Sequence, residues 1–308
     1  MGSVAVLAQG VRRAFGDVHA VRGMDMEAHS GEVTALVGPN GSGKTTLLLV
    51  LATLLVPDAG QVRIAGFDPV TQPGEVRRVM GWSPDVFGLY ENLTAAEYLD
   101  VMAAAYRVPA TVRRLRVSHL LGLARLEDHA GAPVHTLSRG QKQRLGLVRA
   151  LVHEPRVLLL DEPASGLDPR SRVALRDLLR TLAADGVAVV VSSHILSDLE
   201  ELADRVVFVD AGQTVGQHLI TELPAAEATR TYRLRALDMP RLVEALDLAG
   251  IPHDPPAAPG LDVRVTGGDP AAARLLADLV NSGVLVTSFA PLGGALEAAY
   301  LDLTEESA

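Results

Sequence analysis

The sequence predicts an α/β fold, in which a parallel sheet flanked by helices is followed by a small C-terminal α+β domain. Two apolar, β-branched runs, Val157–Leu160 and Val187–Val191, have the length of strands and lie on either side of an amphipathic helix expected over Ser171–Ala184. A third run, Glu32–Val37, leads through a glycine-rich loop into a helix expected from Thr45 onward. Apolar strands that alternate with helices are typical of parallel sheets buried on both faces.

The segments around this core have a different pattern. Before the glycine-rich loop, Val4–Gln9 and Val18–Met26 are expected to be strands, with turn chemistry at Phe15–Asp17 between them. They predict an antiparallel β subdomain. From about residue 83 to residue 154 the periodicity is helical, which predicts a helical subdomain inserted into the core.

Two helices of this subdomain have candidate capping residues. Thr94 is expected to cap a helix over Ala95–Tyr106, and Thr111 is expected to cap one that continues to Leu123. A threonine hydroxyl at such a position accepts a hydrogen bond from an amide of the first helical turn.

The alternation of apolar strands and helices weakens past Asp210. Leu223–Ala226 is the expected join between two domains, 1–222 and 227–308. The second domain is expected to alternate strands with helices around a proline-rich loop. Its expected elements are the strand Thr231–Leu237, the helix Arg241–Ala249, the loop Pro252–Pro259, the strand Leu261–Thr266, the helix Pro270–Asn281 and the strand Val284–Ala290.

The composition excludes several classes of protein. With 308 residues, of which 48% are hydrophobic, the chain can bury a full core and is not a disordered protein. The absence of cysteine excludes disulfides and thiol nucleophiles. The charged residues are interspersed along the chain, and their net charge of −9 is opposite in sign to that of a nucleic-acid-binding surface. We therefore expect no nucleic acid partner.

We expect the protein to be cytoplasmic. Its first residues, Met1–Leu7, lack the basic start, long apolar stretch and cleavage site of a secretion signal. Its longest apolar run, Leu47–Val56, is too short for a membrane-spanning helix, which needs about 20 residues. Any role at a membrane is therefore expected to depend on a partner.

The glycine-rich loop, residues 38–45, matches the phosphate-loop pattern G-x-x-x-x-G-K-[ST] between an expected strand and an expected helix. Glycines let successive backbone N–H groups point at phosphate oxygens, Lys44 can reach the β- and γ-phosphates, and the Thr45 hydroxyl can hold Mg²⁺. The sequence thus predicts a P-loop NTPase with a RecA-like core that binds ATP and Mg²⁺. The residues expected at the phosphates are Gly38, Pro39, Asn40, Gly41, Ser42, Gly43, Lys44, Thr45 and Thr46.

A second motif places two carboxylates at the end of the strand expected at Val157–Leu160. Asp161 is expected to hold Mg²⁺, directly or through water, and Glu162 to accept a proton from the water that attacks the γ-phosphorus. An apolar strand that ends in Asp-Glu is, by itself, more often a solvated strand terminus. The phosphate loop beside it favours the catalytic interpretation.

Further motifs, in their order along the chain, resemble those of the ATP-binding cassette (ABC) proteins. Leu137–Gln141 is similar to the signature sequence Leu-Ser-Gly-Gly-Gln, with Arg139 at its third position. Ala164–Asp168 resembles the family's D-loop, Ser192–His194 its switch histidine, and Phe15 the aromatic residue that stacks on adenine. The ordered set covers about the first 220 residues.

The resemblance implies an ATPase that works as a homodimer, or as a heterodimer with a second ATPase subunit. The signature of one subunit would contact the γ-phosphate of an ATP bound to the other, so that one site needs two chains. His194 would contact the γ-phosphate and position the attacking water, with Lys44 and Glu162 in the same site. The nucleotide-binding residues that the resemblance adds are Phe15, Ser138, Arg139, Gly140, Gln141 and Asp168.

One position departs from the family pattern. At the hinge into the helical subdomain, where the family has Gln, this chain has Asp85. Asp85 can accept a hydrogen bond from Mg²⁺-bound water, which makes it a candidate catalytic and metal-site residue. It is shorter than Gln, lacks the amide donor and brings a negative charge toward the phosphates, so we expect an altered hydrolysis rate or coupling. The alternative is a solvated loop residue.

The resemblance also implies a membrane partner. Phe87–Thr94 is similar to the surface that receives a short helix from an integral membrane permease on a separate chain, with Tyr90 and Leu93 as apolar contacts. An ordinary capped helix start fits these residues equally well. The C-terminal domain, ending in Leu296–Thr304, resembles that of the two-component, ABC-2 type exporter branch, which includes drug and antibiotic resistance exporters. A dimer-stabilising appendage is the alternative.

We therefore expect the ATPase subunit of an exporter, peripheral on the inner face of the cell membrane through its permease. The alternative is a soluble ABC ATPase that acts on nucleic acid or ribosomes. The single cassette, the lack of a heptad run and the negative net charge argue against that alternative.

Overall fold

In the computed structural model, the described residues are 2–86, 88–222, 230–255, 260–292, 296, 299 and 300. The chain divides into two compact units, Met1–Leu219 and Ile220–Ala308. The join expected at Leu223–Ala226, Phe87 and the last part of Leu296–Thr304 lie outside the described residues. Within the described ranges, no helix is both long enough and apolar enough to cross a membrane.

The first unit is organised by a predominantly parallel sheet whose strand order is β5-β6-β7-β3-β8-β9. All neighbouring strands run parallel except the last pair, β8 and β9. Every residue of β3, β6 and β7 is buried, as the apolar runs predict. The strands are β3 (Val33–Val37), β5 (Met80–Ser83), β6 (Val157–Asp161), β7 (Ala188–Ser193), β8 (Arg205–Asp210) and β9 (Gln213–Leu219).

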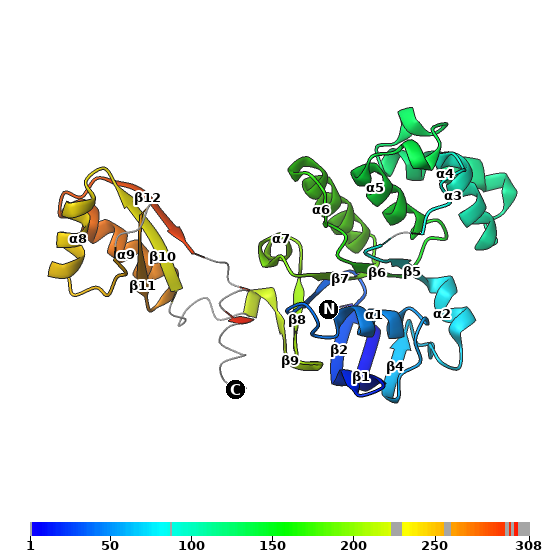
Figure 1. The fold of residues 1–308 in the computed structure, drawn as a ribbon, viewed down its shortest axis with the longest axis horizontal. Helices are drawn as coiled ribbons and strands as arrows, with labels where there is room; N and C mark the ends of the chain where they lie inside the picture. Colours follow the sequence, from blue (N-terminus) through cyan, green and yellow to red (C-terminus); the bar gives the residue numbers. More distant parts are fainter. Residues whose placement is uncertain are drawn as a thin grey trace. The chain divides into compact units, whose positions relative to one another are not determined.

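Helices cover both faces of this sheet (Figure 1). The helix α1 (Lys44–Leu51) contacts β6 and also β2 of a second sheet, whereas α6 (Pro169–Ala184) packs on β3 and β7. One cluster of buried side chains extends from α1 to both sheets and includes Leu47, Leu51 and Leu159. This core fixes the position of the loop that precedes α1. The short helix α7 (Leu196–Glu200) follows β7.

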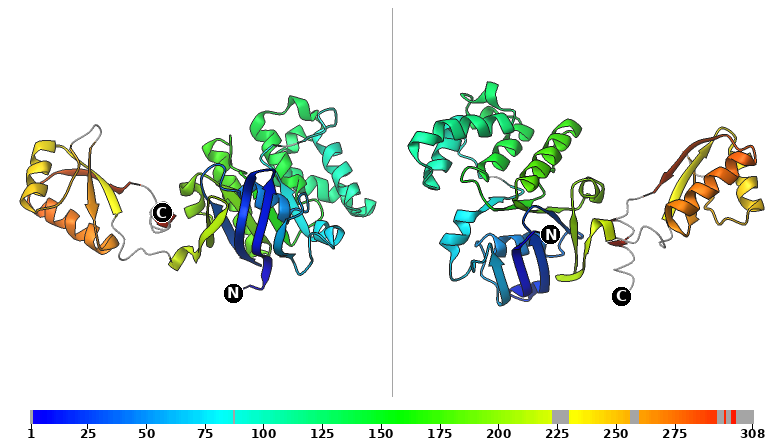
Figure 2. Two further views of the ribbon diagram at one scale, coloured as in Figure 1. Left: turned by 60° about the horizontal axis from the view of Figure 1, so that its bottom comes forward. Right: turned by 180° about the vertical axis from the view of Figure 1, so that it is seen from behind.

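The second sheet of this unit is antiparallel, with the order β2-β1-β4, and is drawn in blue and cyan in Figure 2. Its strands are β1 (Val4–Phe15), β2 (Val18–His29) and β4 (Ala59–Ile64), and α2 (Pro73–Val79) follows. The expected first strand, Val4–Gln9, is too short. Gly10, at a φ of 59°, accommodates an irregularity in the pairing with β2. The strand then resumes at the buried Val11, because glycine adopts positive φ without strain.

The helical subdomain contains α3 (Ala95–Ala105), α4 (Ala110–Leu123) and α5 (Arg139–Arg149). The predicted cap of α3 is confirmed: Thr94 Oγ1 accepts from the Glu97 amide, and the Glu97 carboxylate accepts from the Thr94 amide. The predicted cap of α4 is wrong. Its N-cap is Pro109, with φ −57° and ψ 136°, and Thr111 lies in the first turn. The fixed φ of proline sets the entry into this helix without a side-chain hydrogen bond.

A stacked pair connects the helical subdomain to β5. The rings of Tyr106 and His153 lie 3.9 Å apart and nearly parallel, and His153 Nε2 lies 3.1 Å from the Met80 carbonyl at the start of β5. Burial lowers the pKa of His153 to about 4, so the ring is neutral at pH 7 and donates Nε2–H to that carbonyl. The hinge at Asp85 therefore follows a strand that is anchored at its other end.

The second unit is a three-stranded antiparallel sheet of order β11-β10-β12 with two helices. Its elements are β10 (Arg230–Ala236), α8 (Met239–Leu248), β11 (Leu261–Val265), α9 (Gly268–Asn281) and β12 (Val286–Pro291). The core, which includes Leu234, Leu242 and Leu279, lies between the sheet and the helices. This is the small α+β fold that the alternating pattern predicts.

Candidate functional site

The parallel sheet brings the predicted phosphate-binding and catalytic motifs to one edge. The glycine-rich loop follows β3, Asp161 ends β6, His194 follows β7, and Asp85 lies two residues past the end of β5. These four strands are neighbours in the order β5-β6-β7-β3 and run parallel, so their carboxyl ends meet at the same edge. Open α/β sheets bind ligands at such an edge.

The glycine-rich loop has a backbone that only glycine permits at key positions. Gly43, the N-cap of α1, has a φ of 98°, and a Cβ there would lie 2.4 Å from the Ala20 carbonyl oxygen. A Cβ on Gly38 would lie 2.1 Å from the Val209 carbonyl oxygen. Since real Cβ atoms do not approach a carbonyl this closely, both glycines are required to seat the loop between β2 and β8.

Lys44 is held across this loop. Its Nζ donates to the carbonyls of Gly38 at 2.7 Å and Pro39 at 2.9 Å, and the residue is 6% exposed. Burial lowers the pKa of Lys44, and the carboxylates of Glu162 and Asp161 oppose that shift. The ammonium group and the two carboxylates are therefore close enough to interact electrostatically, as a phosphate and Mg²⁺ site requires.

Asp161 is buried and oriented by Ser192, for which no role in the site was expected beyond its place in the motif Ser192–His194. Ser192 Oγ donates to Asp161 Oδ1 at 2.6 Å and accepts from the Glu162 amide at 3.2 Å. The serine thus fixes both acidic residues of the motif at once. The signal that would have identified it is its place in β7, opposite Asp161 in the parallel register.

Glu162 and His194 form a pair at the mouth of the site. His194 Nδ1 lies 3.0 Å from both Glu162 carboxylate oxygens. Glu162 has a φ of 48°, which is strained for a residue other than glycine, and its amide is held by the Ser192 carbonyl at 3.2 Å. Strain of this kind persists only where the surrounding structure imposes it. Here the strained backbone directs the Glu162 carboxylate toward the His194 imidazole.

Two predicted residues lie at the border of the site. Phe15, the last residue of β1, is 46% exposed, and the Arg13 guanidinium lies 4.9 Å from its ring centroid. Asp85 is exposed beyond the end of β5. The described hydrogen bonds and ion pairs include none for Asp85, so its role at the metal or the phosphates stays a prediction.

The signature residues Ser138–Gln141 lie at the start of α5, and they are expected to serve the ATP of the other chain. Ser138 is the N-cap of α5, and its side chain accepts from the Gln141 amide while the Gln141 side chain accepts from the Ser138 amide. Arg139 and Gly140 form the first turn of this helix. None of the hydrogen bonds described for these residues reaches the phosphate loop. Asp168 caps α6 in a similar way, accepting from the amides of Arg170 and Ser171.

The donor set fits Mg²⁺ bound together with a nucleotide. Mg²⁺ usually takes one or two protein oxygens and completes its shell with phosphate oxygens and water. Asp161, with one carboxylate oxygen fixed by Ser192, and Thr45, in the first turn of α1, are oxygen donors of this kind. When bound, the ion would neutralise charge that develops on the phosphates.

We predict that Ser192→Ala raises the Mg²⁺ concentration for half-maximal ATP hydrolysis by about tenfold, because Asp161 loses the hydrogen bond that orients it. Ser193→Ala is the matched control, since Ser193 Oγ accepts from the Ile195 amide instead. A titration of ATPase activity with Mg²⁺ measures both variants. Equal Mg²⁺ dependence of the two variants would contradict the role of Ser192.

Comparisons with known proteins show the family to which the chain belongs. Residues 21–165 match the ABC transporter family. The chain is 36% identical over 260 residues to the probable multidrug ABC transporter ATP-binding protein YbhF of Escherichia coli (strain K12), with 80% of this chain and 45% of YbhF covered. It thus spans less than half the length of that relative.

In two further comparisons, the match covers a larger share of the other protein's length. The chain is 32% identical over 306 residues to the daunorubicin/doxorubicin resistance ATP-binding protein DrrA of Streptomyces peucetius, with 97% of this chain and 92% of DrrA covered. It is similar, with a TM-score of 0.63 and 27% identity, to a dimeric post-hydrolysis state of an ATP-binding cassette bound to ADP and Pi, with 70% of this chain and 98% of that one covered. This chain belongs to the ATP-binding proteins of the ABC transporter family.

Proposed function

We propose that this chain is the ATP-hydrolysing subunit of a two-component exporter. The observation that carries the proposal is the Glu162–His194 pair, 3.0 Å apart at the sheet edge that also holds Lys44 and Asp161. A carboxylate beside a lysine and a Mg²⁺ ligand is placed to take a proton from water that attacks a phosphate. A module that only binds ATP would not need this pair.

Glu162 acts as the general base, and His194 holds it in position. Because Nδ1 of His194 faces the Glu162 carboxylate, Nε2 is the nitrogen that turns toward the γ-phosphate. Lys44 exchanges the carbonyls of Gly38 and Pro39 for phosphate oxygens when ATP binds. The backbone amides at the start of α1 complete the phosphate cradle.

The active form is a dimer in which the α5 start of one chain covers the ATP of the other. Two features support this arrangement. Ser138 and Gln141 form the capping box of α5, so the positive end of this helix's dipole lies at the signature residues. The cassette with bound ADP and Pi, to which this chain is similar, is itself dimeric.

The transported compound passes through a permease on a separate chain, and this subunit is peripheral on the inner face of the membrane. Tyr90, which is 59% exposed, contacts Tyr98 edge-on at 6.1 Å and belongs to the docking surface together with the half-buried Leu93. The names of YbhF and DrrA refer to multidrug transport and to daunorubicin/doxorubicin resistance. Of the drug, antibiotic or lipid-like substrates that we propose, they favour a drug or an antibiotic.

A groove beside the helical subdomain, lined by neither Tyr90 nor Leu93, is a second candidate for permease docking. Its volume is about 690 Å³, and it lies between the end of α3, α4 and the segment that follows α5. Arg78, Arg107 and Arg116 line it together with apolar side chains, whereas Glu154 is the one acidic residue among those that line it. Arg78 pairs with Glu75 and Arg116 with Glu154, so Arg107 is the cation of this groove for which no ion pair is described, and an acidic, amphipathic segment of the permease would complement it.

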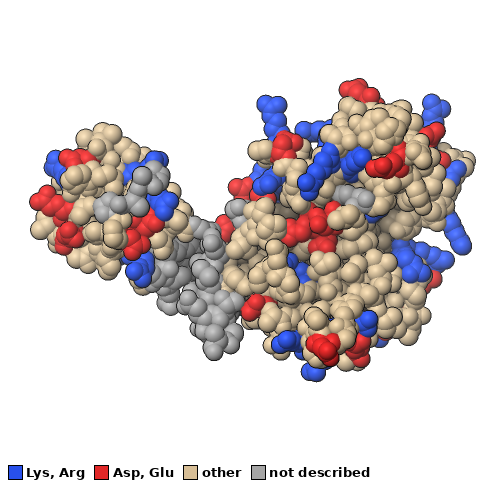
Figure 3. Space-filling view, viewed as in Figure 1, with Lys and Arg blue, Asp and Glu red and all other residues tan. Residues whose placement is uncertain are grey.

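The alternative, action on nucleic acid or ribosomes, has less support. Figure 3 shows basic and acidic side chains interspersed on the visible face of each unit, without the continuous basic stripe that nucleic acid binding needs. The relatives compared above are named for transport or drug resistance.

We predict that Glu162→Gln lowers ATP turnover by about a hundredfold or more, while ATP still binds and holds two chains together. The amide keeps the size of the carboxylate but accepts no proton. Steady-state ATPase assays and size-exclusion chromatography with light scattering, with and without ATP, measure both effects. Turnover at the rate of the unaltered protein would remove Glu162 from the role of base.

We predict that Asp85→Gln leaves ATP binding unchanged but alters the ATPase rate of the complex with the permease. Gln adds an amide donor and removes a negative charge next to the phosphates. The complex is obtained by co-purification from membranes with a polytopic partner, and the failure to find one argues against the exporter role. Identical rates of Asp85→Gln and the unaltered complex would place Asp85 outside the coupling path.

A further inference from the structure

We propose that Arg139 is a positioning residue that locks the D-loop, Ala164–Asp168, to the start of α5 and thereby places the general base Glu162. The inference rests on the proposed function, since it concerns the chain's own ATP hydrolysis. It adds a role within one chain for a residue that the family resemblance connects only with the ATP of the other chain.

Arg139 occupies a position where a basic residue needs a reason. It is the first residue of α5, directly after the N-cap Ser138, and a positive charge there opposes the helix dipole. The described residues offer its side chain no hydrogen bond and no ion pair, and the residue is exposed. Neither helix stability nor charge pairing therefore explains why an arginine occupies this position.

The guanidinium rests on the D-loop instead. A Cβ built on Gly166 would lie 2.9 Å from Arg139 Nε, 3.0 Å from Cζ and 3.3 Å from one terminal nitrogen. Gly166 has a φ of 72°, so the D-loop turns at this residue. The missing side chain of Gly166 is what provides the space in which the flat guanidinium lies against the backbone.

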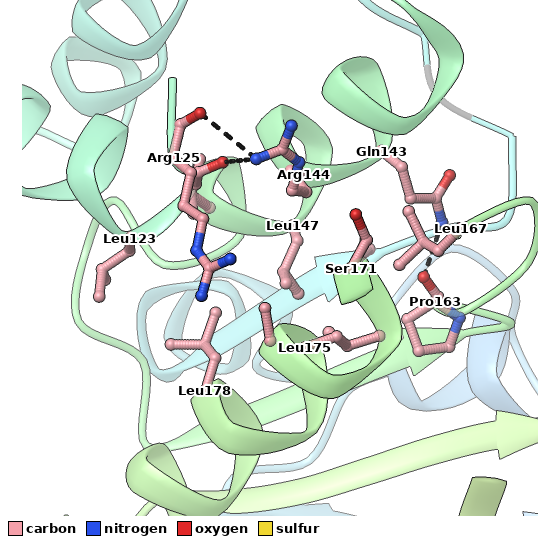
Figure 4. Close-up of a pocket in the computed structure, with 14 residues that line it drawn as sticks. Leu123, Arg125, Gln143, Arg144, Leu147, Pro163, Leu167, Ser171, Leu175 and Leu178 are labelled. Atoms are coloured by element: carbon pink, nitrogen blue, oxygen red, sulfur yellow. Dashed lines mark hydrogen bonds between the residues drawn. The ribbon is translucent and has the colours of Figure 1, made fainter. Parts of the chain in front are cut away.

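Two neighbouring contacts make the same connection between α5 and the D-loop region. Gln143 Nε2 donates to the Pro163 carbonyl at 3.0 Å in a buried position, as Figure 4 shows. Gly140 faces the Leu167 side chain, with 3.8 Å between a Cβ built on it and Leu167 Cδ2. The first two turns of α5 thus contact the segment 163–167 at both of its ends.

This segment is in turn bonded to Glu162. The Ser165 amide donates to the Glu162 carbonyl at 3.0 Å, and the Leu167 amide donates to the Ala164 carbonyl at 3.2 Å. Because Glu162 has a strained φ of 48°, its carboxylate direction depends on how these turns are held. A D-loop released from Arg139 lets the backbone of Glu162 relax and moves the base relative to His194.

The consequence is a link between the two ATP sites of the dimer. The signature segment contacts the partner's ATP, and Arg139 connects that segment to the base that serves the chain's own ATP. Contact between the signature segment and the partner's ATP can therefore change the position of Glu162 in the chain's own site. The change passes through a short series of contacts within a single chain.

A double-mutant cycle in kcat tests the proposal with Arg139→Ala, Gly166→Ala and the double variant. The methyl group that Gly166→Ala introduces displaces the guanidinium, so each single change acts on the same contact. We expect each to lower kcat by about threefold to tenfold with an unchanged KM for ATP, and the double variant to lose no more than the more impaired single variant.

Gly186→Ala is the matched control for the backbone. Gly186 has a φ of 92° and no atom within 4 Å of a built Cβ, so its alanine variant carries the strain of positive φ without displacing any side chain. We expect it to lower the melting temperature like Gly166→Ala but to leave kcat unchanged. A fall in kcat for Gly186→Ala as large as that for Gly166→Ala would attribute the effect to general destabilisation and overturn the proposal.

Two further outcomes would also overturn the proposal. Additive losses of kcat in the double variant would show that Arg139 and Gly166 act independently. A raised KM for ATP with unchanged kcat in Arg139→Ala would assign Arg139 to a direct phosphate contact across the dimer. Failure of the proposed function gives a different result, because the unaltered chain then neither hydrolyses ATP nor dimerises with it.

Discussion

The parallel pairing of β5, β6, β7 and β3 is the constraint on which the rest of the structure depends. These strands are paired side by side, and β3, β6 and β7 are buried along their whole length, so their register is fixed by packing on both faces. Fixed register places Asp161 opposite Ser192 and puts the phosphate loop next to His194. A slip of one residue would turn Asp161 away from the site, and the motifs would lose their mutual geometry.

The site combines rigid support with local strain. Gly38 and Gly43 seat the loop against the carbonyls of Val209 and Ala20, where no side chain fits. Glu162, in contrast, is held at a positive φ because its amide donates to Ser192 and its carbonyl accepts from the Ser165 amide. Rigid elements therefore position the proposed phosphate-binding loop, whereas the proposed base lies on a turn whose conformation is imposed by its neighbours. This division is the physical reason for expecting substitutions outside the nucleotide contacts to change turnover without changing ATP binding.

Much of this arrangement could be predicted from the sequence, because local patterns encode it. The apolar runs predicted the buried strands, and the capping residue Thr94 predicted the start of α3. The contacts between motifs could not be predicted in this way. Neither the hydrogen bond from Ser192 to Asp161 nor the placement of Arg139 on Gly166 has a local signal, since each joins residues about 30 positions apart through the tertiary fold. The cap at Thr111 was wrong because Pro109 already fixes the entry into α4.

The proposed mechanism requires that one ATP site be built from two chains. Mixing two inactive variants tests this requirement most directly: Lys44→Ala, which lacks the phosphate-binding ammonium, and Gly140→Asp, which places a negative charge in the signature. A Cβ fits at Gly140, with its nearest contact at 3.8 Å, and an acidic residue in the first turn of α5 suits the helix dipole, so the fold is retained. Each mixed dimer then contains one site with an intact loop and an intact signature. We predict single-turnover ATP hydrolysis in the mixture well above the sum of the two variants measured alone. Hydrolysis no greater than that sum would contradict a shared site.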